Sequence, residues 1–160
     1  VNYQTGEPIP AEIVERIIAA QNYLAAYLNV RQLSFGLTDM AWHTITEPFE
    51  GDVEQFEVAS MAPSQVLPVV PGTAMAPAFG HIFSGGYAAG YYGYKWAEVL
   101  EADAFSLFKE KGIFNREVSG SFRENILSKG GTEHPMELYV RFRGHKPETK
   151  ALIEKMGLGK

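Results

Sequence analysis

Apolar residues recur at helical spacing along most of this 160-residue chain. The first clear repeat comprises Ile13, Val14, Ile17 and Ile18. Such spacing is typical of one face of an α-helix. We predict helices over about 10–21 and 22–45, then a short helix over about 52–61. No segment shows the sustained alternation of apolar and polar residues that favours a strand.

The strongest helical pattern covers residues 87–111. Its apolar stripe comprises Trp96, Val99, Leu100, Ala104, Leu107 and Phe108. Gly112 is a typical helix C-cap, and Asn115 is a typical N-cap for a helix reaching about residue 127. Shorter helices are predicted over about 132–144 and 147–157. We expect Tyr92 and Trp96 to pack away from the face that carries the neighbouring tyrosines.

Residues 62–86 interrupt the helical pattern with four prolines and four glycines. Proline blocks helix interiors, and glycine permits unusual backbone angles, so this stretch is predicted to be a loop. Its apolar residues indicate that the loop is ordered and packed. The predicted fold is therefore all-α, a multi-helical bundle with one long ordered Gly/Pro-rich loop, and residues 1–160 are expected to form a single unit.

Composition narrows the possible functions. Hydrophobic residues make up 46% and charged residues 21%, as in an ordinary globular protein, and the net charge is −5. A negative charge argues against non-specific binding to nucleic acid or anionic membranes. The chain has no cysteine, which removes disulfides and thiol chemistry. No apolar run is long enough to span a bilayer, and no signal peptide is recognisable at the N-terminus.

Candidate chemistry is concentrated in residues 79–94, where four tyrosines fall within eight positions. On a helix, Tyr87, Tyr91 and Tyr94 would share one face, because they are spaced i, i+4 and i+7. A phenol is protonated at neutral pH and donates a hydrogen bond, which can stabilise an oxyanion in a transition state. His81 supplies a second kind of donor beside a glycine stretch.

The same pattern is also typical of a purely structural helix contact with buried phenols. A peptide-binding module without chemistry would retain the tyrosine face as well. Outside this segment, we interpret His43 as a packing or interface residue rather than a metal ligand. Arg141, Arg143 and Lys146 are interpreted as a solvated helix end near the negative pole of its dipole.

The run GHIFSGGYAAGYYGYKW at 80–96 resembles the glycine-rich loop and following helix of the thimet oligopeptidase family of zinc peptidases. Further similar segments occur in the same order as in that family, at 6–10, 31–37, 102–105, 112–114, 126–131 and 141–144. The resemblance covers nearly the whole chain. It implies hydrolysis of short peptides, either by removal of C-terminal dipeptides or by internal cleavage.

The resemblance also implies roles for individual residues. His81 and Tyr94 match catalytic residues, with Tyr94 in the position of a tyrosine that hydrogen-bonds the tetrahedral oxyanion. His81, Tyr87, Tyr91 and Tyr94 match residues that contact the peptide. Gly85 and Gly86 match the glycine-rich loop that lies over the substrate.

The zinc site of the family is missing from this sequence. The family uses an H-E-x-x-H motif, and none of the four histidines here, His43, His81, His134 and His145, forms one. The resemblance therefore implies the C-terminal part of the catalytic domain of a longer parent, inactive without the N-terminal zinc-binding half. Expected partners are that half and a short peptide, with self-association through uncovered apolar surface. The expected location is cytoplasmic, and a periplasmic one is also compatible with the sequence.

Overall fold

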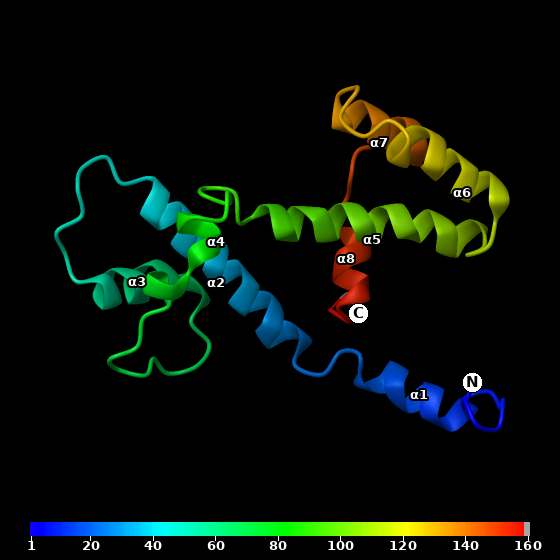
Figure 1. Ribbon diagram of the computed structural model, residues 1–160, viewed down its shortest axis with the longest axis horizontal. Coiled ribbons are helices and arrows are strands. Elements are labelled where there is room, and N and C mark those ends of the chain that lie inside the picture. The colour runs from blue at the N-terminus through cyan, green and yellow to red at the C-terminus, as the bar shows by residue number, and fades with distance from the viewer. Residues whose placement is uncertain (159–160) are drawn as a thin grey trace. The chain divides into compact units, whose positions relative to one another are not determined.

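The computed structural model describes residues 1–158 and confirms the all-α prediction, with no strand in that range (Figure 1). The α-helices are α1 (Ala11–Ala20), α2 (Ala25–His43), α3 (Val53–Met61), α4 (Gly80–Phe83), α5 (Gly93–Lys111), α6 (Arg116–Phe122), α7 (Pro135–Arg143) and α8 (Lys150–Lys155). Two 3-10 turns, η1 (Ala62–Ser64) and η2 (Ala76–Ala78), and a π-helical turn, η3 (Arg123–Leu127), complete the set. None of the described helices is both long enough and apolar enough to cross a membrane. The chain divides into two compact units, Val1–Phe79 and Gly80–Lys160, which are described in turn.

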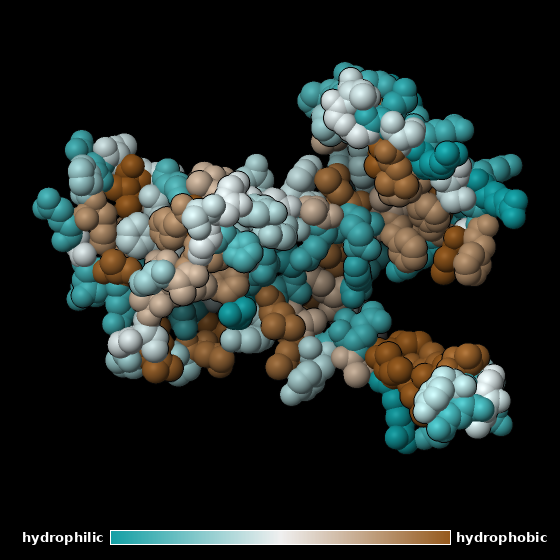
Figure 2. Space-filling view, in the orientation of Figure 1, coloured by the Kyte–Doolittle hydropathy of each residue, from teal (hydrophilic) through white to brown (hydrophobic). Residues whose placement is uncertain are grey.

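In the first unit, α1 and α2 are separated by residues 21–24, close to the predicted boundary between residues 21 and 22. Leu24 adopts a left-handed conformation, with φ of 55°, which a continuing α-helix cannot accommodate. α1 has no buried residue, and its apolar side chains gather on an exposed face (Figure 2). This helix was therefore predicted correctly, but other residues of the first unit do not cover its apolar face.

The core of the first unit lies between α2 and α3. The indole of Trp42 contacts the rings of Phe49 and Phe56, with centroids 4.9 and 4.4 Å away. Asp52 caps α3 by accepting a hydrogen bond from the backbone N–H of Gln55, so this helix begins close to its predicted start.

Two carboxylates of α3 hold the long loop. Glu57 is buried and accepts hydrogen bonds from the backbone N–H groups of Met75, at 2.7 and 2.9 Å, and of Ala76, at 2.6 Å. Glu54 accepts one from Gly72. These polar contacts help to order the loop, and the ring of Phe79 also packs against that of Phe35, with centroids 5.6 Å apart. The expectation that its apolar residues pack is confirmed for Phe79 and Ile82, which are 8% and 1% exposed. It is wrong for Val66, Leu67 and Val70, which are 55–64% exposed.

The second unit is built on α5, which begins at Gly93 and not at Tyr87 as predicted. Gly86 and Ala89 both have positive φ values, 82° and 52°, and such residues cannot continue a right-handed helix. The expectation that Tyr92 and Trp96 pack is also wrong within the described residues, because they are 62% and 45% exposed.

The helices after α5 largely follow the sequence signals. Asn115 caps α6 as predicted, and the helical stretch continues through the π turn to Leu127. α7 begins at Pro135, where the Nδ1 of His134 accepts a hydrogen bond from the N–H of Met136. α8 begins at Lys150, three residues later than predicted, and no side chain caps this start.

In the second unit, α6 and α7 pack against α5 through one cluster of apolar side chains. Its core cluster comprises Ala104, Val118, Tyr139 and Phe142, with Leu100, Leu107, Phe108, Phe122 and Ile126 packed against them. A smaller cluster joins α5 to α8 through Val99, Ala102 and Leu152.

A buried polar network also links α5 to α7. The hydroxyl of Tyr139 donates to Asp103 Oδ2 at 2.6 Å, and Asp103 is 3% exposed. Arg143 donates through Nε to the Asp103 carbonyl oxygen and through Nη2 to Ser106 Oγ. The interpretation of Arg143 as a solvated residue is therefore wrong, because its guanidinium group is held against α5.

Candidate functional site

The structure brings together the four side chains singled out in the sequence, His81, Tyr87, Tyr91 and Tyr94, here called the His–Tyr cluster. The ring of His81 lies 6.1 Å from that of Tyr87 and 6.3 Å from that of Tyr91, measured between centroids. Tyr94 stacks on Tyr87 at 5.1 Å and contacts Tyr91 at 5.0 Å. These separations are typical of favourable aromatic contacts, so the four rings form one group.

The glycine-rich turn explains how His81 and Tyr87 meet. The N–H groups of Ser84 and Gly85 both donate to the carbonyl oxygen of Gly80, which closes the chain directly after α4. The N–H of Tyr87 then donates to the His81 carbonyl oxygen at 3.1 Å. A Cβ atom at Gly85 would lie 2.9 Å from the His81 Cα atom. Only glycine fits this turn without a shift of the backbone.

The cluster forms without the helical face that the spacing predicted. Tyr87 and Tyr91 lie in consecutive turns before α5, and only Tyr94 belongs to the helix. The N–H of Gly90 donates to the Tyr87 carbonyl oxygen, and the N–H of Tyr94 donates to that of Tyr91. These tight turns keep the tyrosines close in space, so the predicted grouping holds although the predicted local conformation does not.

The cluster is accessible, and the phenol of Tyr94 is protonated. His81 is exposed, and Tyr87 and Tyr94 are 38% and 37% exposed. A hydrogen bond with the Tyr87 side chain, together with partial desolvation, raises the pKa of Tyr94 above its ordinary value. A bond that raises a phenol pKa is one in which that phenol donates, so the Tyr94 hydroxyl is a neutral donor at physiological pH.

The described residues do not contain a group of three or more histidine, cysteine or acidic side chains arranged to hold a metal ion. His43 instead lies beside the buried Asp39, with its Nδ1 2.8 Å from Asp39 Oδ1. The cluster itself consists of phenols and one imidazole. Its chemistry is hydrogen-bond donation to an acceptor such as a peptide carbonyl, combined with aromatic contact.

Two features of the second unit were not predicted from the sequence. One is the network around Asp103, whose signal was a charged residue on the apolar stripe of α5, four residues after Val99 and four before Leu107. The other is an apolar groove of about 570 Å³ between α5, α6 and α7. The groove has no comparable signal, because its walls come from three helices separated in the sequence.

Comparison with known proteins gives one consistent result. The family described as Peptidase family M3 matches residues 1–158. The chain is 49% identical to oligopeptidase A of Escherichia coli over 160 residues, which cover 98% of this chain and 23% of that protein. Identity is 38% to the dipeptidyl carboxypeptidase of E. coli and 30% to saccharolysin of Saccharomyces cerevisiae, over 98% of this chain in each case and 23% and 22% of those relatives. The chain thus spans about a quarter of the length of the curated relatives it matches.

Proposed function

The chain belongs to peptidase family M3, and from this premise we propose that it is the substrate-facing C-terminal part of the catalytic domain of a zinc-dependent oligopeptidase or peptidyl-dipeptidase. The observation that carries the proposal is the convergence of His81, Tyr87, Tyr91 and Tyr94 on one accessible surface. All four lie in the segment that resembles the glycine-rich loop of the family.

In this proposal His81 and Tyr94 are the catalytic donors. A peptide carbonyl oxygen entering the cluster competes with the Tyr87 oxygen for the Tyr94 proton. The hydrogen bond from Tyr94 strengthens as negative charge develops on the carbonyl oxygen. Because this bond is stronger in the transition state than in the ground state, it lowers the activation barrier. The raised pKa of Tyr94 keeps the proton in place at neutral pH, so the residue acts by donation without being ionised.

The remaining residues of the site bind and orient the peptide. The rings of Tyr87 and Tyr91 offer flat apolar surface beside the two donors. Gly85 and Gly86 carry no side chain, and both are exposed, so a peptide can approach their backbone closely.

The described residues do not fit a zinc site, since no ligand group is present among them. We therefore propose that zinc is bound by the part of the parent that this chain does not span, and that residues 1–160 alone have no peptidase activity. The natural partners are then that part of the parent and a short peptide. A cytoplasmic location remains a prediction from the sequence.

The replacement Tyr94→Phe in the full-length parent tests the central role. It removes one oxyanion donor, for which a loss of about 10²–10³-fold in kcat is typical. KM should change little, because the lost bond is strongest in the transition state. The measurement is steady-state hydrolysis of a fluorogenic peptide.

Tyr92→Phe is the matched control, because Tyr92 follows Tyr91 in sequence, is 62% exposed and takes no part in the ring contacts of the cluster. It should retain the wild-type kcat. A wild-type kcat in Tyr94→Phe as well would contradict the proposal and favour a peptide-binding surface without chemistry.

A further inference from the structure

A single carboxylate follows the His–Tyr cluster closely in the chain. Glu98 is the only acidic residue between positions 58 and 100. It belongs to α5, four residues after Tyr94, so the two positions are about 40° apart around the helix and about 6 Å apart along its axis. Residues with this spacing share one face of a helix. The face that carries the proposed oxyanion donor therefore continues directly into a negative charge.

The ion pair with Lys95 shows in which direction this carboxylate points. Lys95 Nζ donates a hydrogen bond to Glu98 Oε2 at 2.5 Å, although Lys95 lies three residues closer to the start of α5. Side chains of a helix lean toward its N-terminus. The carboxylate of Glu98 is therefore directed back to the turn that contains Tyr94.

The carboxylate of Glu98 can accept further hydrogen bonds. Its side chain is 44% exposed, whereas that of Lys95 is 20% exposed. Lys95 donates to one oxygen, and an ionised carboxylate has two oxygens with about four acceptor sites in total. Lys95 thus holds the carboxylate in place, and the exposed part of Glu98 is accessible to a cationic group from outside.

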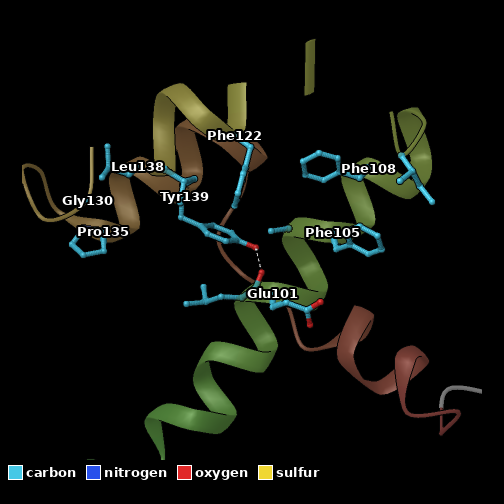
Figure 3. Close-up of a pocket in the computed structure, with 12 residues that line it drawn as sticks. Glu101, Phe105, Phe108, Phe122, Gly130, Pro135, Leu138 and Tyr139 are labelled. Atoms are coloured by element: carbon cyan, nitrogen blue, oxygen red, sulfur yellow. Dashed lines mark hydrogen bonds between the residues drawn. The ribbon is translucent and has the colours of Figure 1, made fainter. Parts of the chain in front are cut away.

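The next carboxylate along α5 is less suited to this role. Glu101 lies about 10 Å along the helix from Tyr94 and lines the apolar groove shown in Figure 3. Its carboxylate accepts a hydrogen bond from Lys155 Nζ at 2.6 Å, which joins α5 to α8. Packing between these two helices accounts for Glu101, whereas no contact between helices accounts for the pair of Glu98 with Lys95.

We propose that Glu98 is a specificity-determining residue, which selects peptides that carry an arginine or a lysine two residues from the scissile bond. An extended peptide advances about 3.3 Å per residue. When the scissile carbonyl oxygen lies at Tyr94, the second residue along the peptide reaches the level of Glu98, where its cationic group binds the second carboxylate oxygen. The inference rests on the proposed function, because it requires a peptide carbonyl at the His–Tyr cluster.

The competing explanation is that Glu98 and Lys95 only stabilise the helix. Ion pairs between partly exposed side chains three residues apart are common on helices and contribute little to stability. Such a pair would leave the choice of peptide independent of Glu98. A comparison of charged and uncharged peptides therefore separates the two roles.

Binding of matched peptides to the full-length parent tests the proposal. Each peptide has an N-methylated scissile bond, which prevents cleavage, and carries arginine or its uncharged analogue citrulline two residues before or two residues after that bond. The arginine peptide should bind about 2–5-fold more tightly than its citrulline partner at one of these positions, as expected for one exposed ion pair. This preference should weaken at high ionic strength.

The replacement Glu98→Gln should abolish the preference for arginine. Glu124→Gln is the matched control, because it removes an exposed carboxylate of η3 and should leave the preference unchanged. A preference that persists in Glu98→Gln would overturn the proposal. Equal binding of arginine and citrulline peptides to the wild-type parent at both positions would also overturn it, and this comparison does not depend on a variant folding.

The two proposals fail in different measurements. If the parent binds none of the peptides, the proposed function fails together with the role of Glu98. Equal binding of all the peptides contradicts only the role of Glu98. A wild-type kcat in Tyr94→Phe contradicts only the catalytic role of Tyr94, because the binding measurements involve no hydrolysis.

Discussion

At the scale of single residues, the chemistry of the second unit depends on the hydrogen bonds that its tyrosine hydroxyls make. Tyr94 and Tyr87 stack with ring planes 23° apart, and the hydrogen bond between their side chains is the largest cause of the raised pKa of Tyr94. Tyr139 shows the same effect in the core, where burial and the hydrogen bond to Asp103 raise its pKa strongly. Both phenols are held neutral, one at the surface and one inside.

Removing the acceptor should therefore lower the pKa of Tyr94. In Tyr87→Phe the hydrogen bond and the interaction with a second ionisable phenol are lost together, and the pKa should fall toward the ordinary value near 10. The measurement is a pH titration followed by NMR of protein labelled with ¹³C at the tyrosine Cζ atom. Tyr92→Phe should leave the titration of Tyr94 unchanged. An unchanged pKa in Tyr87→Phe would show that another contact sets it.

At the scale of elements, short polar contacts decide where helices begin and how loops are held. Glu57 fixes the backbone of the long loop at Met75 and Ala76, and a capping side chain opens α7. Just before α7, Glu133 pairs with Lys129 at 3.2 Å and with Arg141 at 2.7 Å. This carboxylate ties the loop after η3 to the last turn of α7.

The pairing of Glu133 predicts a specific dependence of stability on acid. Hydrogen bonds from Arg141, and then from Lys129, lower the pKa of Glu133 to about 2 from an ordinary 4.5. A lowered pKa means that the folded state favours the ionised form, so this contribution is present above pH 4.5. It is lost as the pH falls from 4.5 to about 2.

The test compares thermal melting of wild type and Glu133→Gln across that range of pH. The variant should melt at a lower temperature near pH 7, and the difference should shrink as the pH falls from 4.5 toward 2. Glu154→Gln removes an exposed carboxylate of α8 and should keep the wild-type acid dependence. A constant difference between Glu133→Gln and wild type at every pH would show that the ion pairs contribute nothing to folding.

At the scale of the whole molecule, each unit leaves apolar surface uncovered. In the first unit, Ile13, Ile17 and Ile18 of α1 are 45–60% exposed and lie on one helical face. In the second unit, the groove on α5 is open. Isolated helices as short as α1, which has ten residues, are only marginally stable in water. We therefore expect α1 to be stable when its apolar face packs against another surface.

The 160-residue chain by itself should therefore self-associate. Sedimentation velocity should show a weight-average mass that rises with concentration, because apolar faces find cover on other copies. The double replacement Ile17→Asp with Ile18→Asp should reduce this association, whereas Glu15→Gln on the polar side of α1 should not. A monomer at all concentrations would contradict the expectation.

Much of this protein was determined by the sequence alone. The period of apolar residues specified the helices, since burial of one face imposes a repeat near 3.6 residues. Glycine, proline and capping residues such as Asn115 located several ends, because their effects on the backbone are local. The run at 80–96 was sufficient to indicate the family to which the chain belongs.

Other features were decided only by the tertiary structure. The positive φ of Ala89 moved the start of α5 to Gly93, since alanine itself carries no local signal for that conformation. Arg143 was placed against Asp103, and apolar residues of the long loop were left exposed, because both depend on which helices pack together. The groove depends on three helices at once. Residue spacing reports interactions over a few positions, whereas burial and pairing between distant segments follow from packing.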